Sequence, residues 1–482
     1  MITPIGILIL AYIYLKEKSK SHDYLLPFFI SLPLNDIYFA NFGNLQIRAF
    51  HIFGILMTYY ALINKFQSTT REILVSRNTC VLLFFLFSLV LSSFMPLLLE
   101  SEVHVTSINT HFLDYNNTEP LHFTSNNLVQ LLYPLMMFIF FIATKHTLRS
   151  TNTNISIKHI HATCAIILTS TFYFILSYIF AGEAGISFLV KIFQWHRDLY
   201  SEIIGLAVGY NSLADIPRSY SLVGEPGFTT LYLSVILCGF LLTIKLSNST
   251  TTLERRATRV ASLIIIATVI LGGSTSGYIS LVFSAAVSML IYQLTPSPGG
   301  TLGKIRTLLA FITASIVLLA IVIAIAQILD FNIVEYFLLE HLTKVTGETG
   351  SGPTRLLTIL RSFELFMAHP ILGVGWGSHR STSLIAYLLS NCGLVGTTLF
   401  IVFNYLIILD SARNLLTTED PKTRKEVGIW LGMFITLFFM MLMKSPSFLT
   451  FGWYWFFAAK LEVLNEHGEQ IPPEELKTGD TS

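Results

Sequence analysis

Long apolar runs recur along the chain, and most of its charged residues fall between them. Of the 482 residues, 53% are hydrophobic and 12% are charged. Soluble globular proteins carry about 25% charged residues, and a helix needs about 20 apolar residues to cross a bilayer. The pattern therefore predicts an all-α polytopic membrane protein. With a net charge of +1 and no basic stripe, the sequence predicts no nucleic-acid partner.

The apolar runs predict about 12–13 transmembrane helices, the lower number applying if one short segment does not cross. The candidate spans lie near 2–16, 24–40, 48–64, 79–99, 128–144, 160–181, 229–244, 260–272, 274–292, 308–329, 384–409, 427–443 and 446–461. The first follows Met1 without a basic segment or a small-residue cleavage site, so it is interpreted as a retained span. The four cysteines lack the paired spacing of a metal site or disulfide framework.

Lysine and arginine collect in alternate loops, whereas the loop at 100–127 contains neither. Because cytoplasmic loops collect basic residues, the N-terminus is predicted to lie outside and the C-terminus inside. The chain then divides into N-terminal spans (1–181), a first large outer loop (182–228), central spans (229–329), a second large outer loop (330–383), C-terminal spans (384–461) and an inner tail (462–482). Connections as long as the two outer loops are usually functional or disordered, and their apolar residues at helical spacing predict amphipathic helices at the membrane surface.

Arginines stand in the two outer loops, against the usual charge bias. The candidates are Arg218 in the first loop and Arg355, Arg361 and Arg380 in the second. The planar guanidinium group suits phosphate, pyrophosphate or carboxylate, which predicts an anionic ligand. The alternatives are ion pairs with loop acids such as Asp198, Asp215 or Glu364, or anchoring to lipid headgroups.

The first loop ends in "RSYSLVGEPG", where Glu225 precedes Pro226. Proline disfavours helix at the residue before it and suits the first turn of the next span. The Glu225 carboxylate is therefore predicted at the outer mouth of span 229–244, as a general base for a sugar hydroxyl or as a partner that orients an arginine. It could equally complement the helix dipole. Tyr220, within the same segment, is a candidate for binding sugar.

The second loop contains "SGPTRLLTILRSFELFMAHPILGVGWGSHRSTS". Its spacing predicts a helix from about Thr354 to Ala368, which begins near Pro353 and ends by His369. The closely spaced glycines of "GVGWGS" would let the backbone approach a ligand or another helix. They are not a nucleotide loop, because no strand precedes them and no Lys-Ser/Thr pair follows. His379 and His369 are candidate substrate-binding residues, with packing or capping as the alternative.

"SGPTR", "HPILGVGWGS" and "LLSNCGLVG" together resemble the O-antigen polymerase and ligase superfamily of bacterial envelopes. The upstream arginine and "EPG" are similar to a segment of many polysaccharide polymerases. The resemblance implies a GT-C-type membrane glycosyltransferase that joins oligosaccharide repeat units carried on undecaprenyl pyrophosphate, at the periplasmic face of the bacterial inner membrane. It implies no cofactor, neither nucleotide sugar nor metal, and outer-loop arginines that engage the pyrophosphate.

The resemblance also implies roles for particular residues and partners. Glu225, Arg218 and Arg380 would be catalytic, while Arg355, Arg361, His379, His369 and Tyr220 would bind pyrophosphate or sugar. The partners would be the lipid-linked glycan donor and acceptor, the bilayer, and a chain-length regulator as a further candidate. Ligases usually carry a His-Asn pair where this chain has Thr382-Ser383. This departure favours a polymerase; the alternatives are an O-antigen ligase acting on lipid A core and a lipid or polysaccharide transporter.

Overall fold

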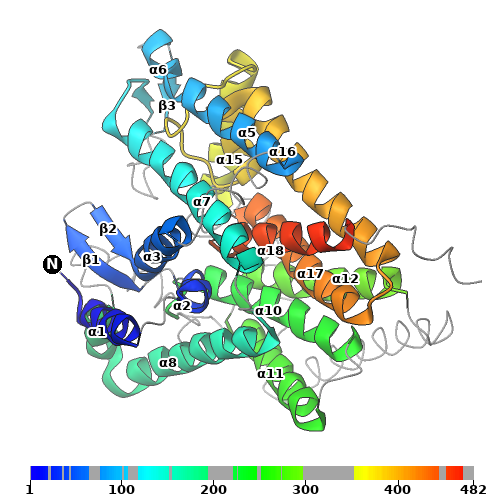
Figure 1. The fold of residues 1–482 in the computed structure, drawn as a ribbon. Helices are drawn as coiled ribbons and strands as arrows, with labels where there is room; N and C mark the ends of the chain where they lie inside the picture. Colours follow the sequence, from blue (N-terminus) through cyan, green and yellow to red (C-terminus); the bar gives the residue numbers. More distant parts are fainter. Residues whose placement is uncertain are drawn as a thin grey trace, which may run out of the picture.

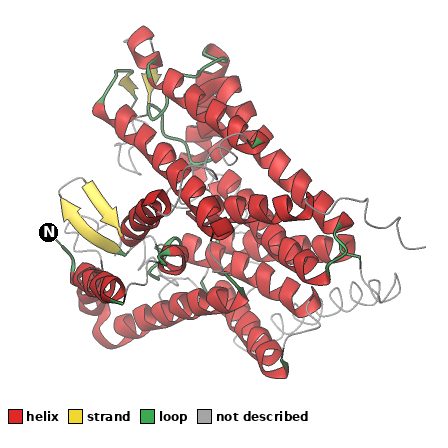
Figure 2. Ribbon diagram, viewed as in Figure 1, coloured by secondary structure: helices red, strands yellow, loops and turns green. Residues whose placement is uncertain are grey.

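The computed structural model describes residues 2–19, 23–34, 37–42, 45–63, 76–99, 103–106, 118–150, 155–193, 221–224, 226–246, 251–272, 274–296, 352–444 and 452–469. Within these ranges almost all of the chain is helical, and its strands form two small hairpins (Figure 2). The protein is therefore an all-α polytopic membrane protein, as predicted.

Among the described residues, seven helical segments are long and apolar enough to cross a membrane. They are α5 (Arg77–Ser93) with its continuation α6 (Met95–Leu98), α7 (Ser125–Ser150), α8 (Ile157–Phe193), α10 (Pro226–Leu246), α12 (Thr275–Leu294), α16 (Leu384–Thr417) and α17 (Pro421–Lys444). The other helices are α1 (Pro4–Lys18), α2 (Leu25–Ser31), α3 (Ala49–Ile63), α11 (Thr252–Leu271), α15 (Gly352–Ala368) and α18 (Gly452–Glu469).

The span predicted at 24–40 is not one helix. The helix α2 ends at Ser31, and β1 (Tyr38–Phe42) pairs with β2 (Leu45–Arg48) in an antiparallel hairpin. Pro33 follows the end of α2, and a proline there cannot continue the helical hydrogen bonding. The predicted span at 308–329 lies outside the described residues.

Several other predicted boundaries fall inside helices. The helix α8 continues to Phe193, so it includes the beginning of the predicted loop 182–228. The helix α10 begins at Pro226, in agreement with proline in the first turn. The predicted tail 462–482 begins within α18, where Glu462 is buried.

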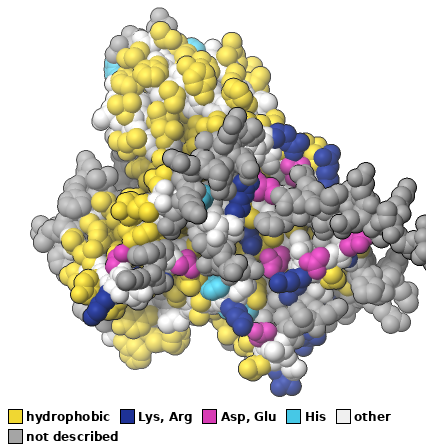
Figure 3. All heavy atoms as spheres, in the orientation of Figure 1, with side chains coloured by type: hydrophobic (Ala, Val, Ile, Leu, Met, Phe, Trp, Pro, Cys, Tyr) yellow, Lys and Arg dark blue, Asp and Glu magenta, His cyan; other side chains and the backbone are white. Residues whose placement is uncertain are grey.

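Two lobes are visible in Figure 1. The helices α5, α7, α15 and α16, with the short hairpin of β3 (His104–Val105) and β4 (Glu119–Pro120), form the upper lobe. The helices α10, α11, α12 and α17 form much of the lower one. The upper lobe is almost wholly hydrophobic on the face drawn in Figure 3, as expected for a surface in contact with lipid.

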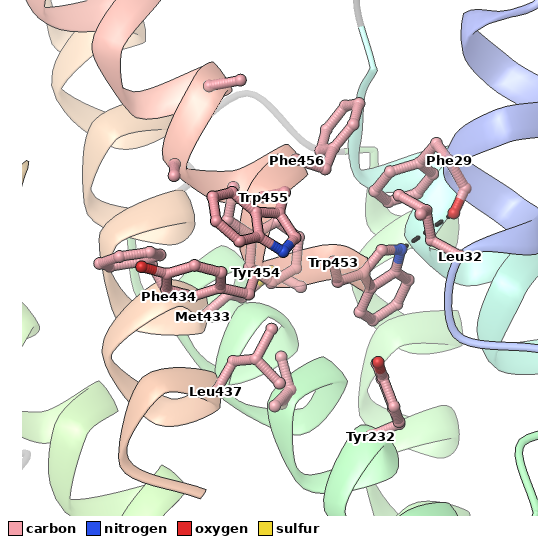
Figure 4. Packing of buried hydrophobic residues seen from close by; sticks show 14 of the residues in the cluster. Phe29, Leu32, Tyr232, Met433, Phe434, Leu437, Trp453, Tyr454, Trp455 and Phe456 are labelled. Atoms are coloured by element: carbon pink, nitrogen blue, oxygen red, sulfur yellow. Dashed lines mark hydrogen bonds between the residues drawn. The ribbon is translucent and has the colours of Figure 1, made fainter. Parts of the chain in front are cut away.

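The helix α18 lies in the interior where the lobes meet. Its residues Trp453, Tyr454 and Trp455 are almost completely buried, and the Trp453 indole N–H donates to the Phe29 carbonyl at 2.9 Å (Figure 4). Phe29 belongs to α2, so this bond joins the end of one short helix to the beginning of another. A buried indole needs such a partner because its N–H has no water to bond.

Ion pairs gather at the far end of the upper-lobe helices. They are Lys145–Glu462, Arg149–Glu466, Arg77–Asp410 and Lys460–Glu426. Arg77 begins α5 and Arg149 is near the end of α7, so both pairs lie at the ends that the topology prediction assigned to the inner side. The opposite ends of α5 and α7 meet α15 and the segment that follows it.

Candidate functional site

The helix α15 is amphipathic, with hydroxyl-bearing side chains facing the protein and large apolar side chains facing outward. Its hydroxyl-bearing residues Thr358 and Ser362 are buried against the protein, whereas Leu360 and Met367 point outward, with Met367 75% exposed. The exposed apolar set on this helix is Leu356, Leu357, Leu360, Phe363 and Met367. Leu365 is buried, but a helix that turns most of its leucines away from the protein is suited to contact with lipid at the membrane surface. The predicted helix of the second loop is thus confirmed.

The helix α16 is broken near its beginning. Gly393 has φ 62° and ψ −162°, which are not helical values, so the backbone groups on either side of it need partners from elsewhere. The segment that follows α15 supplies them. Pro370 and Ile371 carbonyls accept from the Leu394 and Val395 N–H groups, at 2.7 and 3.3 Å.

The same segment also donates to the other side of the break. Val374 N–H donates to the Ser390 carbonyl at 2.8 Å, and Gly375 N–H donates to the Asn391 carbonyl at 3.2 Å. We call the bonded unit of residues 370–375 and 390–395 the interlock. Ser92 of α5 closes it, because its hydroxyl donates to the Leu372 carbonyl at 3.0 Å and to that of Asn391.

Two glycines make this close approach possible. A Cβ on Gly373 (φ +69°) would lie 2.4 Å from the Ser390 oxygen, and one on Gly393 (φ +62°) would lie 2.3 Å from the Ile371 oxygen. Both also have positive φ, which side chains rarely tolerate. Of the two predicted uses of these glycines, the structure shows the approach to another helix.

The buried Asn391 side chain holds the segment beyond the interlock. Its Oδ1 accepts from the N–H groups of Ser378 and His379, at 3.1 and 2.9 Å. Its amide donates to the His379 and Tyr387 carbonyls, both at 2.9 Å. Every polar atom of this amide is thereby satisfied inside an apolar helix.

His379 is fully buried, and both of its ring nitrogens bond to the protein. Nδ1 accepts from the Thr106 N–H at 3.3 Å, so Nε2 carries the proton and bonds with the Ser362 hydroxyl at 3.0 Å. Burial, with a smaller contribution from the Arg361 cation, lowers the pKa of His379 from 6.5 to about 3. The ring is therefore neutral at physiological pH, which matches the packing alternative rather than a group that contacts substrate.

The hairpin β3–β4 and the beginning of α7 cover this segment. Thr106 accepts from the Arg380 N–H at 2.9 Å, and the His104 carbonyl accepts from Arg361 Nη2 at 3.0 Å. Asn127 of α7 donates to the Trp376 carbonyl at 2.9 Å and to the Ser378 hydroxyl at 2.8 Å. These bonds attach the "GWGSHR" segment to two further elements besides α16.

A family model described as O-antigen ligase matches residues 260–391. This part of the chain is similar to the O-antigen ligase family. The match supports the resemblance to the O-antigen polymerase and ligase superfamily, and it ends at Asn391, the residue that holds the loop before α16. No curated protein matched the chain in a search.

Three of the predicted arginines belong to α15 and the segment that follows it, and hydrogen bonds connect the places where they stand. Thr382, two residues beyond Arg380, bonds through its hydroxyl to the Arg355 carbonyl at 3.2 Å. Arg361 bonds to His104 in β3, and the Arg380 N–H donates to Thr106, one residue beyond that strand. Arg355 is exposed, while Arg361 and Arg380 are half-buried. Arg355 and Arg361 belong to α15, the helix that carries the exposed apolar set.

Other predicted site residues are placed differently. Arg361 forms an ion pair with Glu364 at 2.7 Å, which is one of the alternatives weighed for it. His369 lies at the other end of α15 from Arg355, about 21 Å along an ideal helix axis. Arg218, Tyr220 and Glu225 lie outside the described residues, although α10 begins immediately after Glu225.

Asn391, Thr106 and Asn127 contribute to the site but were not predicted. Asn391 could have been noticed, since an amide inside an apolar run needs partners. Thr106 and Asn127 come from the loop at 100–127 and from α7, and nothing local in the sequence connects them to residues 376–380. In the described part of the chain, no group of three or more His, Cys, Asp or Glu is arranged to hold a metal ion.

Proposed function

We propose that the protein is a membrane glycosyltransferase that polymerises oligosaccharide repeat units carried on undecaprenyl pyrophosphate, at the periplasmic face of the bacterial inner membrane. Family members with this domain are glycosyltransferase-like membrane enzymes. One observation carries the proposal: Arg355 is exposed on α15 next to the exposed Leu356 and Leu357, and the Thr382 hydroxyl, two residues beyond Arg380, bonds to the Arg355 carbonyl. A cationic group next to a lipid-facing helix suits a substrate with an anionic head and an isoprenoid tail.

The chemistry follows from the substrate. Glycosyl transfer from a lipid pyrophosphate builds negative charge on the leaving group, and guanidinium groups fixed in place stabilise that charge. The rigid attachment of the Arg380 backbone favours such a role, since a charge that is already positioned needs no reorganisation during the reaction. Glu225 is the proposed general base for the acceptor hydroxyl.

Deleting the gene tests this proposal. The surface glycan should then stop at a single repeat unit, and unchanged long chains would contradict it. Arg355→Ala and Arg380→Ala should each abolish chain extension in membranes that contain wild-type amounts of the protein, as should Arg218→Ala. Leu263→Ala is a matched control, because Leu263 is an exposed residue of α11, and it should leave chain extension unchanged.

A second candidate function is the transfer of a finished glycan to lipid A core. The description of the matching family model favours it, and the arginines near α15 suit it equally well, because both reactions use the same kind of lipid-linked donor. The two functions differ in what a deletion leaves behind. Loss of a ligase leaves long chains on the carrier lipid and none on lipid A, whereas loss of a polymerase leaves single repeat units.

A further inference from the structure

The buried Asn391 side chain bonds to the backbone of Ser378 and His379, the two residues that precede Arg380. Asn391 is 0% exposed, and it is part of α16, a helix otherwise rich in apolar residues. The side-chain N–H of Asn404, another buried asparagine of α16, donates to the Phe400 carbonyl of the same helix. By contrast, three of the four described bonds of Asn391 to backbone groups reach Ser378 and His379.

A second contact holds the same backbone from the opposite side. The carbonyl of Thr106 accepts from the Arg380 N–H, while the N–H of Thr106 donates to the His379 ring. The segment from Ser378 to Arg380 is thus bonded both to α16 and to Thr106, the residue that follows the strand His104–Val105. Only beyond this doubly bonded stretch does the half-buried side chain of Arg380 begin.

We propose that Asn391 is a positioning residue for Arg380. It touches no substrate, and it acts by fixing the backbone from which the Arg380 guanidinium reaches the pyrophosphate of the lipid donor. This inference rests on the proposed function, because it takes the donor head group as the ligand of Arg380. Fixing backbone dihedrals before binding removes an entropic cost that the ligand would otherwise have to offset.

The test is a double-mutant cycle on donor binding. The probe is undecaprenyl pyrophosphate without sugar, and its Kd is measured for the full-length protein in phosphatidylglycerol–phosphatidylethanolamine nanodiscs. Asn391→Ala should weaken binding about tenfold, the order expected when one or two residues must be ordered on binding. In an Arg380→Ala background the same change should have less than about a twofold effect, because its target has been removed.

Asn404→Ala is the matched control. Asn404 is also a buried asparagine of α16, and its Oδ1 accepts from the Tyr454 hydroxyl at 3.0 Å, about 20 Å along the helix from Asn391. It should lower the melting temperature without changing the Kd. If Asn391→Ala weakens binding equally with and without Arg380, or leaves the Kd unchanged, Asn391 does not position Arg380.

A second measurement needs no donor lipid. Phenylglyoxal modifies arginine, and mass spectrometry gives its rate at Arg380. Asn391→Ala should change this rate several-fold and Asn404→Ala should not; equal rates would overturn the proposal. Where Asn391→Ala fails to fold, His379→Leu replaces it, since it removes the Thr106 bond and should also alter the rate at Arg380. If the wild type binds no undecaprenyl pyrophosphate, but Asn391→Ala changes the modification rate at Arg380 as expected, the proposed donor is wrong and the positioning role of Asn391 stands.

Discussion

The interlock between residues 370–375 and α16 gives a quantitative prediction for Gly373→Ala and Gly393→Ala. In each variant the new Cβ meets a backbone atom at 2.4 Å or less, and a carbonyl of the main chain cannot rotate away as a side chain would. When residues 370–375 and 390–395 move apart, the hydrogen bonds Val374–Ser390 and Leu394–Pro370 break.

The cost can be added from its parts. A residue with a side chain at positive φ costs about 1–2 kcal/mol, and each lost hydrogen bond costs about 1 kcal/mol. Each variant should therefore be destabilised by about 3–4 kcal/mol. Opening of the interlock should become more frequent by two to three powers of ten, at about 1.4 kcal/mol for each factor of ten.

Thermal unfolding in detergent and hydrogen exchange of the peptide containing Val374 and Leu394 measure these two quantities. Gly428→Ala is the control, since its Cβ would meet side-chain methyl groups, the nearest that of Leu246 at 3.0 Å, and its φ is not positive. The double variant Gly373→Ala/Gly393→Ala should lose about 1–2 kcal/mol more than either single one, because the lost hydrogen bonds are shared but each alanine has its own positive φ. Melting and exchange like those of Gly428→Ala would refute the steric reasoning.

Two other predictions concern buried polar groups. His379 should make stability depend on pH, because burial lowers the pKa of its ring to about 3 in the folded protein. Below about pH 6.5 the unfolded chain binds a proton at this residue and the folded protein does not. The contribution of neutral His379 to stability is therefore complete above about pH 6.5 and is lost as the pH falls towards 3. Unfolding midpoints measured from pH 7 to pH 4 should therefore fall less steeply for His379→Gln than for the wild type, and parallel curves would contradict this. Lys145→Met should destabilise the fold by about 3–5 kcal/mol, because it leaves the buried Glu462 without its cation, and Lys145→Met/Glu462→Leu should recover most of the loss in a thermal melt. A double variant no more stable than Lys145→Met would show that the pair is not what holds α7 to α18.

The sequence predicted the features that depend on neighbouring residues. Apolar runs gave most of the spans, Pro226 gave the beginning of α10, and the period of apolar residues gave α15 almost to its ends. These predictions are correct because the burial of a helix face and the missing N–H of proline depend on residues close together in the sequence. The same reasoning was wrong at 24–40, where a high total hydropathy predicted one helix but the chain forms the short helix α2 and the first strand of a hairpin.

Within the site, the sequence located the arginines but not what holds them. Thr106 and Asn127 lie more than 200 residues before the loop they bond to, so their role depends on the packing of α5 against α16 and of α7 against α5. The glycines of "GVGWGS" were recognised as places of close approach, yet their partner could have been a ligand or a helix. Only the break in α16 at Gly393 shows that the partner is a helix. In the sequence this break is marked by nothing more than a glycine in an apolar run.

The break in α16 also restricts how the protein can enter its membrane. A helix that leaves the ribosome with an interruption near Gly393 has two carbonyls and two N–H groups without internal partners, and in hydrocarbon each would cost several kcal/mol. The residues that bond to them, 370–375, are synthesised first. Residues 370–375 are therefore needed beside α16 once the break at Gly393 forms in the membrane, and a chain that inserts α16 alone would have to keep Gly393 helical until they arrive.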